Sequence, residues 1–285
     1  MTRSRHSRRA IWVAGLVLAI SAGTPSVSMA ADQEPAPGSD VGVQAIRDTF
    51  NVDFNRWAAG PYSRSEAAED FGNVSGMNEA RSMISGGRFR ATLEPGLLSG
   101  AGGNLWSVDV TDGTEYEMRY TINFHSQFDW SRGGKVGWGF SVGDGASGCV
   151  KANGNGGSLR LMWYTNDSGR TYFQPYLYHA GMPSNCGDTF GRTYPSSGSI
   201  QRQTNYAVTM RIKSNTGTSR NGRAVVMING TTVLDTPVQW TSNDVKRQIR
   251  NVWSHSFRGG SQDYWTSDTV GYIYYDDFSI RHIAS

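Results

Sequence analysis

Residues 116–124 alternate apolar and polar side chains at every position, and this stretch limits the possible folds more than any other. Side chains two apart in a β-strand share a face, so the alternation indicates a strand with one buried face. Similar short runs recur between turn residues, and the chain holds 35 glycines. We therefore expect further strands over 89–93, 157–164, 171–178, 206–212, 223–228, 231–235 and 271–281.

The pair Asn229-Gly230 lies between the expected strands over 223–228 and 231–235 and is typical of a two-residue β-hairpin turn. Weak periodicity between Ile46 and Ala68 predicts a few helical turns, and no long amphipathic helix interrupts the strands. These patterns predict an all-β fold, a lectin-like sandwich of the jelly-roll (concanavalin) type. We expect it to form a single domain over residues 46–285, with one face open to a ligand.

The N-terminus has the pattern of a secretory signal peptide over residues 1–30. Four arginines precede an apolar run from Ile11 to about Ala22, and the small residues before Ala31 suit cleavage after Ala30. The apolar run is shorter than the roughly 20 residues of a membrane anchor. We therefore expect a secreted, bacterial protein that is not membrane-bound after cleavage, with a flexible lead over residues 31–45.

The basic character of the whole chain belongs largely to this segment. The precursor carries 27 basic and 24 acidic side chains, and removal of the four arginines leaves 23 against 24. This balance argues against a nucleic-acid partner, because nucleic-acid-binding domains are usually strongly basic. Affinity for an acidic polymer would have to come from a local cluster of cations.

The chain contains two cysteines, Cys149 and Cys186, which suit one disulfide in an exported protein. Thiol catalysis is the weaker alternative, because neither cysteine has a Cys-x-x-Cys partner or a nearby paired histidine. The bridge would tie the loop after Lys135 to the loop after Tyr178, and we expect it to pre-organise the surface between them.

A cluster of polar and cationic side chains is expected between residues 128 and 178. In the strand over 157–164, Ser158 and Arg160 share a face with Met162, opposite three residues that we expect in the core, namely Leu159, Leu161 and Trp163. Tyr176 and Tyr178 share a face of the next strand by the same rule. Together with Lys135, these side chains could hold an anionic sugar and move protons.

At these positions the sequence resembles polysaccharide lyase family 14, which are secreted jelly-roll enzymes acting on alginate and related polyuronates. The resemblance spans residues from about 50 to 282. It is carried by Phe128-Asp129-Trp130 with Gly133-Gly134-Lys135, Ser158-Leu159-Arg160-Leu161-Met162-Trp163, Tyr176-Leu177-Tyr178-His179 with Gly187-Asp188, Ile228-Asn229-Gly230, Ser254-His255-Ser256-Phe257-Arg258-Gly259-Gly260 and Tyr275-Asp276-Asp277-Phe278. The family usually continues Gly-Gly-Lys with Leu-Pro-Gly, whereas this chain continues with Val136-Gly137-Trp138, a difference that bears on substrate preference.

The resemblance implies β-elimination on an acidic polysaccharide. It assigns Lys135, Ser158, Tyr176 and Tyr178 to catalysis, and Arg160 together with Lys135 to substrate binding. Arg160 suits the uronate carboxylate, and Lys135 could neutralise it too or transfer protons if its pKa is lowered. One tyrosine would transfer a proton, with neighbouring cations lowering its pKa, while the other positions substrate. Ser158 would add a hydrogen bond.

Two assignments have alternatives in the sequence. The segment between Trp163 and Tyr176 is a few residues longer than usual, so Tyr172 and Gln174 compete for the tyrosine positions. His125 could be a supplementary base near Lys135 or equally a turn histidine, and His125, His179 and His255 all stay outside the catalytic set.

Other functions fit the sequence less well. A glycoside hydrolase needs two carboxyl groups, and acids near the site are few, namely Asp129, Asp144 and Asp188. A non-catalytic carbohydrate-binding protein on the same sandwich is the main alternative. No cofactor is expected; Asp276-Asp277 and Asp144-Gly145 could bind a structural Ca²⁺, but without a convincing ligand spacing. We expect a monomer.

Overall fold

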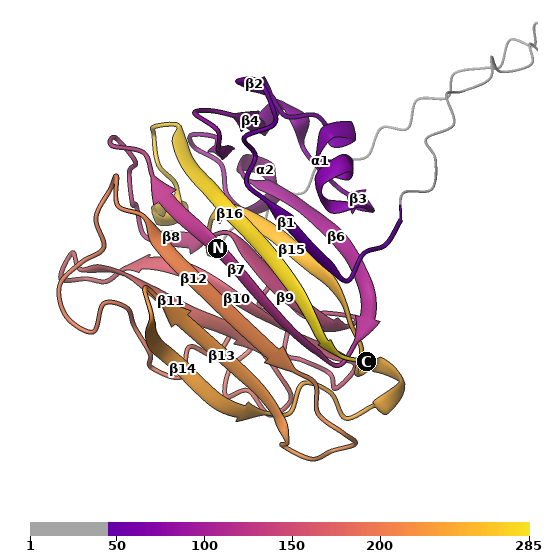
Figure 1. Cartoon of the computed structure of the whole chain (residues 1–285). Helices are drawn as coiled ribbons and strands as arrows, with labels where there is room; N and C mark the ends of the chain where they lie inside the picture. Colours follow the sequence, from indigo (N-terminus) through magenta and orange to yellow (C-terminus); the bar gives the residue numbers. More distant parts are fainter. Residues whose placement is uncertain (1–44) are drawn as a thin grey trace, which may run out of the picture. The chain divides into compact units, whose positions relative to one another are not determined.

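The computed structural model describes residues 45–285, and the expected signal peptide and nearly all of the lead lie outside the described residues. From residue 45 onward the chain forms two β-sheets with antiparallel strand pairing, which pack face to face (Figure 1). The expectation of an all-β sandwich is therefore confirmed. No helix in this part of the chain has the length and apolar character needed to cross a membrane.

The larger sheet contains nine strands within the described residues and lies in front in Figure 1. Eight of these strands follow one another across the sheet, and the ninth, β1 (Thr49–Val52), pairs with β16 in addition. The main path runs in the order β14 (Thr231–Val238), β13 (Gly222–Ile228), β12 (Tyr206–Lys213), β7 (Glu115–Phe124), β16 (Gly271–Ala284), β5 (Phe89–Leu93), β4 (Ser82–Ile84) and β2 (Gly60–Pro61).

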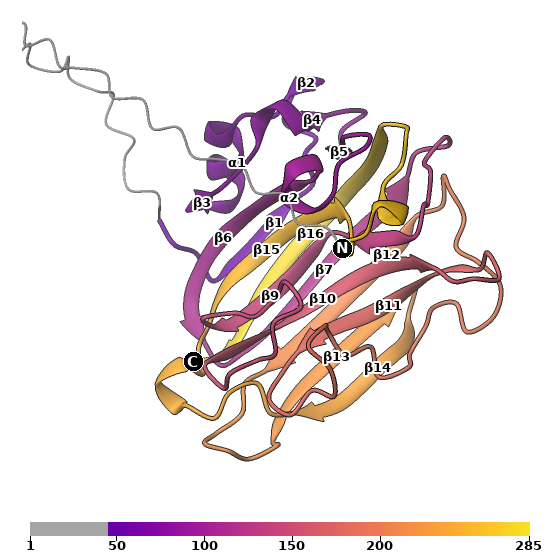
Figure 2. The same cartoon turned by 180° about the vertical axis from the view of Figure 1, so that it is seen from behind.

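The smaller sheet contains seven strands in the same part of the chain and is seen from its outer side in Figure 2. Strands β8 and β9 follow one another between β10 and β15, so together they act as one interrupted strand. The strands are β11 (Thr171–Tyr178), β10 (Gly156–Thr165), β8 (Gly133–Lys135), β9 (Trp138–Gly143), β15 (Ile249–Arg258), β6 (Asn104–Gly113) and β3 (Val74–Ser75).

The interruption between β8 and β9 corrects one expectation from the sequence. Residues 136–137 were expected to form a loop after Lys135, but they stay within the sheet. The Val136 N–H donates to Leu161 O on β10, and Gly137 O accepts from the His255 N–H on β15. Gly137 has φ +73°, which favours glycine, so the chain bulges here without leaving its neighbours.

The remaining elements are short. Helix α1 covers Arg64–Phe71 and begins with a capping box, in which Ser63 and Glu66 bond to each other's backbone N–H. The helical turns expected between Ile46 and Ala68 are confirmed only from Arg64 onward, since the earlier part of that segment includes β1. The others are α2 (Ser99–Gly102) and the 3₁₀ turns η1 (Glu79–Arg81), η2 (Asp244–Lys246) and η3 (Asp263–Trp265).

The hairpin between β13 and β14 is confirmed. Asn229 and Gly230 both have positive φ, at 48° and 76°, as a type I′ turn requires. The strands flank the turn with Ile228 opposite Thr231.

The core lies between the two sheets and is rich in aromatic rings. Trp138 packs 4.3 Å from Phe278 and 4.8 Å from Trp106, measured between ring centroids. Leu159 and Trp163 of β10 are fully buried in the same core. Since these residues face inward, the alternate residues of β10 must face the outer surface of the seven-stranded sheet.

Candidate active site

Strand pairing brings the predicted residues together on the outer face of the seven-stranded sheet. On β10 and β11, Arg160 lies opposite Tyr176 and Ser158 lies opposite Tyr178. On the other side of β10, Lys135 of β8 lies opposite Met162. Lys135 and Tyr176, which are 41 positions apart in sequence, thus come close together because both of their strands pair with β10.

A pocket of about 650 Å³ opens above these strands. Its lining includes Lys135, Arg160, Tyr176 and Tyr178, but not Ser158. Its other lining residues are Ser99, Gly148, Cys149, Met162, Tyr164, Gln174, Cys186, Phe257, Gly259, Gly260, Ser261, Gln262, Tyr264 and Trp265. No acidic side chain is among them, so the charge in this pocket is cationic.

Lys135 is buried, with only 7% of its surface exposed. Its Nζ lies 3.8 Å from the ring centroid of Tyr176 and 5.8 Å from that of Phe257. Burial holds the pKa of this ammonium well below its usual range, and the positive charge of Arg160 lowers that pKa further. Lys135 is therefore suited to exist as a neutral amine, which can accept a proton.

Arg160 is also buried, and its guanidinium lies among three aromatic rings. Its Cζ is 5.7 Å from the Tyr176 centroid, 5.4 Å from Tyr178 and 5.6 Å from Trp253. Burial lowers the pKa of the guanidinium from its usual value, although the two tyrosines oppose the shift. A positive charge held in a hollow without an acidic lining is suited to bind an anionic group of a ligand.

Gly139 of β9 makes room for Arg160. A Cβ atom at this position would lie 2.5 Å from Leu159 O and 2.8 Å from Arg160 Cγ. The side chain of Arg160 can therefore pass over β9 next to residue 139 only because that residue is glycine and has no Cβ.

The two tyrosines are held differently. Burial and the neighbouring Tyr178 raise the pKa of Tyr176 to about 12, outweighing the opposing effect of Arg160. The expectation that cations lower the pKa of this tyrosine is therefore not met. The Tyr178 hydroxyl accepts a hydrogen bond of 2.8 Å from the Cys149 N–H, which ties it to the loop above β10. Tyr176 is thus a neutral proton donor near neutral pH.

Ser158 does not line the pocket. Its side chain is fully buried, and its Oγ donates a hydrogen bond of 2.7 Å to Ala146 O. This contact holds the loop after β9 against the sheet.

The expected disulfide between Cys149 and Cys186 is present, with Cα atoms 4.0 Å apart. It joins the loop after β9 to the loop after β11. Both cysteines line the pocket, and Gly187 packs so closely on Tyr176 that a Cβ there would lie 2.5 Å from the ring. The bridge therefore fixes two loops that contact the tyrosines.

The three unassigned histidines lie in different places. His125 contacts Tyr272 and Tyr274 of β16 and does not line the pocket, so it is not a base beside Lys135. It is the turn histidine of the other expectation, since its carbonyl accepts from the Phe128 N–H and its Nδ1 from the Gln127 N–H. His179 is buried, with Nε2 3.2 Å from Asp188 Oδ2 and Nδ1 2.9 Å from Ala180 O. It therefore anchors the loop that carries Cys186.

His255 lies on β15 close to the pocket. Its ring stacks on Trp253 at 5.0 Å between centroids. Burial and the charge of Arg160 lower its pKa to about 3, so it is neutral at physiological pH. Its Nδ1 is buried without a hydrogen-bond partner among the described residues.

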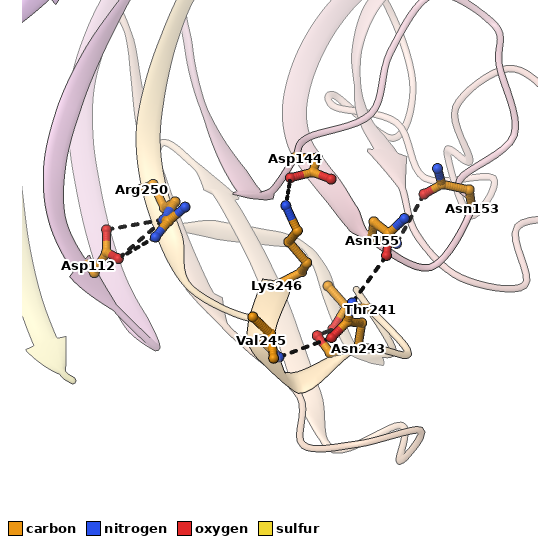
Figure 3. A network of polar contacts seen from close by, with 9 residues as sticks. All are labelled: Asp112, Asp144, Asn153, Asn155, Thr241, Asn243, Val245, Lys246 and Arg250. Carbon is orange, nitrogen blue, oxygen red and sulfur yellow. Dashed lines mark hydrogen bonds and ion pairs between the residues drawn. The ribbon is translucent and has the colours of Figure 1, made fainter.

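The acids that the sequence placed near the site are occupied elsewhere. Asp129 accepts from the Ser131 N–H, and Asp188 contacts His179. Asp144 forms an ion pair of 2.6 Å with Lys246, in the network drawn in Figure 3. Within residues 45–285, no three His, Cys, Asp or Glu side chains gather in a group that could hold a metal ion.

Several residues of the pocket wall, among them Phe257 and Trp265, have no role that the sequence predicts. Phe257 lies opposite Lys135 on β15, and Trp265 lies in the 3₁₀ turn η3 after that strand. The period-two pattern of β11 does place Gln174 and Tyr172 on the face of Tyr176, which explains why they competed with it. No comparable local pattern marks Trp265.

Comparison with known proteins now identifies the family. The family model "Polysaccharide lyase 14" matches residues 100–278. The chain belongs to polysaccharide lyase family 14. This confirms the family expected from the sequence, and this lyase shares its fold with solved enzymes of the same kind.

The alginate lyase Aly36B is 56% identical to this lyase, with 84% of this chain and 99% of that one covered and a TM-score of 0.83. More distant are the alginate lyase of Aplysia kurodai (16% identity, 83% and 99% covered, TM-score 0.64) and vAL-1 from Chlorella virus (17%, 74% and 93%, 0.58). These two show similarity of fold alone. None of the curated proteins compared with the chain matches it.

Proposed function

We propose that this polysaccharide lyase cleaves alginate by β-elimination at the 4-O-glycosidic bond and leaves unsaturated oligosaccharides. The observation that carries the proposal is the buried Lys135 amine, whose pKa is lowered and whose Nζ lies 3.8 Å from the Tyr176 ring centroid. Within residues 45–285 it has no acidic partner that would keep it protonated. Such an amine can act as a base inside a cationic pocket.

Arg160 would bind the carboxylate of the uronate residue to be cleaved. The C5 proton of a uronate is weakly acidic, and it becomes removable only when the adjacent carboxylate is neutralised. A guanidinium offers two parallel N–H donors to a carboxylate. The Arg160 Nε is buried without a hydrogen-bond partner among the described residues, so the side chain has donor capacity left for substrate.

Proton transfer would be divided between Lys135 and Tyr176. The Lys135 amine removes the C5 proton, the C4–C5 double bond forms, and the C4–O4 bond breaks. The Tyr176 phenol, with its pKa near 12, then protonates the leaving O4. Tyr178 would position the substrate, because its hydroxyl is fixed by the Cys149 N–H. Ser158 would act indirectly, through the loop it holds.

The relative Aly36B supports both the substrate and the choice of tyrosine. Its solved structures include a lysine/tyrosine double mutant with alginate tetrasaccharide and a lysine/methionine double mutant with alginate trisaccharide, each 55% identical to this chain. The replaced methionine and tyrosine lie 14 positions apart there, the spacing of Met162 and Tyr176 here. Tyr178 lies 16 positions after Met162, so the spacing favours Tyr176.

The pocket lining counts against hydrolysis. A glycoside hydrolase uses two carboxyl groups on either side of the scissile bond. None of the residues that line this pocket is acidic, so neither the acid nor the nucleophile of that mechanism is available.

We also propose that the enzyme is exported and acts as a monomer outside the cell. The arginine-rich, apolar segment over residues 1–30 supports export. N-terminal sequencing of the protein from the culture medium should find Ala31 first, and light scattering should give the mass of one chain. A retained Met1 or a dimer mass would contradict these two expectations.

The substrate is tested on purified protein with mannuronate-rich alginate, guluronate-rich alginate and polyglucuronate. Ultraviolet absorbance reports the unsaturated product, and a reducing-end assay reports any cleavage. We expect absorbance and reducing ends to rise together on alginate. Reducing ends without absorbance would mean hydrolysis, and binding without either signal would leave a carbohydrate-binding protein.

A further inference from the structure

A second hollow of about 480 Å³ adjoins the catalytic pocket at Tyr264. It is lined by Ser131, Arg132, Thr165, Asn166, Asp167 and Tyr264. Tyr264 also lines the catalytic pocket, so the two hollows share a wall. A polymer that fills the first could therefore continue into the second.

Arg132 lies at the junction of the two hollows. Its Cζ is 4.9 Å from the ring centroid of Tyr164, and Tyr164 lines the catalytic pocket. The Tyr164 ring in turn lies 5.8 Å from that of Trp265, which lines the same pocket. The rings thus form a continuous aromatic wall from the catalytic pocket to a cation.

The backbone around Arg132 is held firmly. Its carbonyl accepts from the Thr165 N–H at 3.0 Å, and the preceding residue, Ser131, donates from Oγ to Trp265 O at 2.7 Å. The Asp129 carboxylate accepts from the Ser131 N–H at 3.0 Å. These contacts connect the Arg132 loop to β10 and to the wall of the catalytic pocket, so the position of the arginine is defined.

In contrast, the ion-pair partner of Arg132, Asp167, lies exposed on the surface. Arg132 Nη1 forms an ion pair of 2.6 Å with Asp167 Oδ1, and the Asp167 side chain is 92% exposed. Exposed ion pairs contribute little because water and salt screen them. A carboxylate brought by a ligand could therefore replace that of Asp167 at little cost, since a guanidinium binds both in the same geometry.

We propose that Arg132 binds the carboxylate of a uronate residue in the substrate chain, at a subsite next to the catalytic pocket, by displacing Asp167. This inference rests on the proposed function, because it assumes a polyuronate in the catalytic pocket. Tyr264 and Trp265 would border the sugar chain between the two sites. The subsite would make the enzyme favour long chains over short ones.

The test compares steady-state kinetics of Arg132→Ala and Asp167→Asn with the wild type, on alginate oligosaccharides of increasing length and on the polymer. For Arg132→Ala we expect KM for the polymer to rise about three- to fivefold with kcat nearly unchanged. The shortest cleaved oligosaccharide should be unaffected. Asp167→Asn should lower KM for the polymer, because it frees the arginine.

Arg223→Ala is the matched control, since Arg223 forms a similar exposed ion pair with Asp235 on the nine-stranded sheet. It should leave every KM unchanged, and Arg132→Gln serves as a second variant if Arg132→Ala does not fold. An equal effect of Arg132→Ala at all lengths, or no effect at any length, would overturn the subsite. Absence of any lyase activity in the wild type would instead refute the proposed function.

Discussion

Replacement of Gly139 by alanine should damage the site without removing any of its functional groups. The new Cβ would lie 2.5 Å from Leu159 O, which is backbone, and 2.8 Å from Arg160 Cγ and 3.2 Å from Arg160 Cα. Because real Cβ contacts are not this short, β9 and β10 must separate or the arginine stem must move. Overpacking of this kind costs about 1–3 kcal/mol.

Both the stability and the activity of Gly139→Ala can be measured. A loss of about 1–3 kcal/mol lowers the melting temperature by roughly 2–12 °C in a domain of this size. Displacement of Arg160 by about 1 Å should reduce kcat/KM on alginate by about 100-fold, since the carboxylate is no longer aligned. Calorimetry and the absorbance assay give the two values on the same preparation.

Gly100→Ala is the control for this experiment. A Cβ at Gly100 would have its nearest neighbour, Leu105 Cδ2, at an ordinary 3.8 Å. This variant should keep both its melting temperature and its activity. If Gly139→Ala also kept full activity, Arg160 would not need its present position, and the assignment of the carboxylate site to Arg160 would be wrong.

Three further predictions concern the rest of the site. Since burial and Arg160 lower the pKa of Lys135, and only the neutral amine accepts a proton, kcat/KM should fall tenfold per unit below that pKa. Above it, kcat/KM should stay constant until the donor Tyr176 loses its proton near pH 12. Lys135→Arg should be inactive, and a flat acid side of the wild-type profile would exclude Lys135 as the base. Cys149→Ser should lower kcat by freeing the loops that contact the tyrosines, and reductant should lower kcat in the wild type but not in this variant. Ser158→Ala should cost about 0.5–1.5 kcal/mol of stability through the lost bond to Ala146 but less than tenfold in kcat, whereas a larger loss of kcat would indicate a direct catalytic role.

The sequence predicts the strands whose two faces differ in polarity. Strand β7 alternates because its apolar side chains, such as Met118 and Ile122, face the core and its polar ones face solvent. Strand β15 was not predicted, because its large apolar side chains face outward and its small polar ones face the core. It directs Trp253 and Phe257 toward the site, while Ser254 and Ser256 are buried on the core side. Because the outer face of β15 serves the site, its sequence does not show the usual alternation of buried apolar and exposed polar side chains.

The same contrast applies to the site. Alternation along two strands is enough to place Arg160 and Tyr176 on one face, and the resemblance to the family adds Lys135. The direction of the Tyr176 pKa could not be predicted, because it depends on how deeply the ring is buried and on Tyr178 beside it. Ser158 is kept off the pocket lining by the loop that carries Ala146, and alternation does not determine the path of that loop.

The central claim is that Lys135 is the base in an elimination reaction, and one comparison tests it most directly. Wild type, Lys135→Met and Tyr176→Phe are incubated with alginate, and absorbance from the unsaturated product is followed under identical conditions. Removal of a general base costs typically about 100- to 10,000-fold, so Lys135→Met should lose at least that much while it still binds alginate and stays folded. If Lys135→Met still produced the unsaturated product at a rate close to that of the wild type, Lys135 would not be the base.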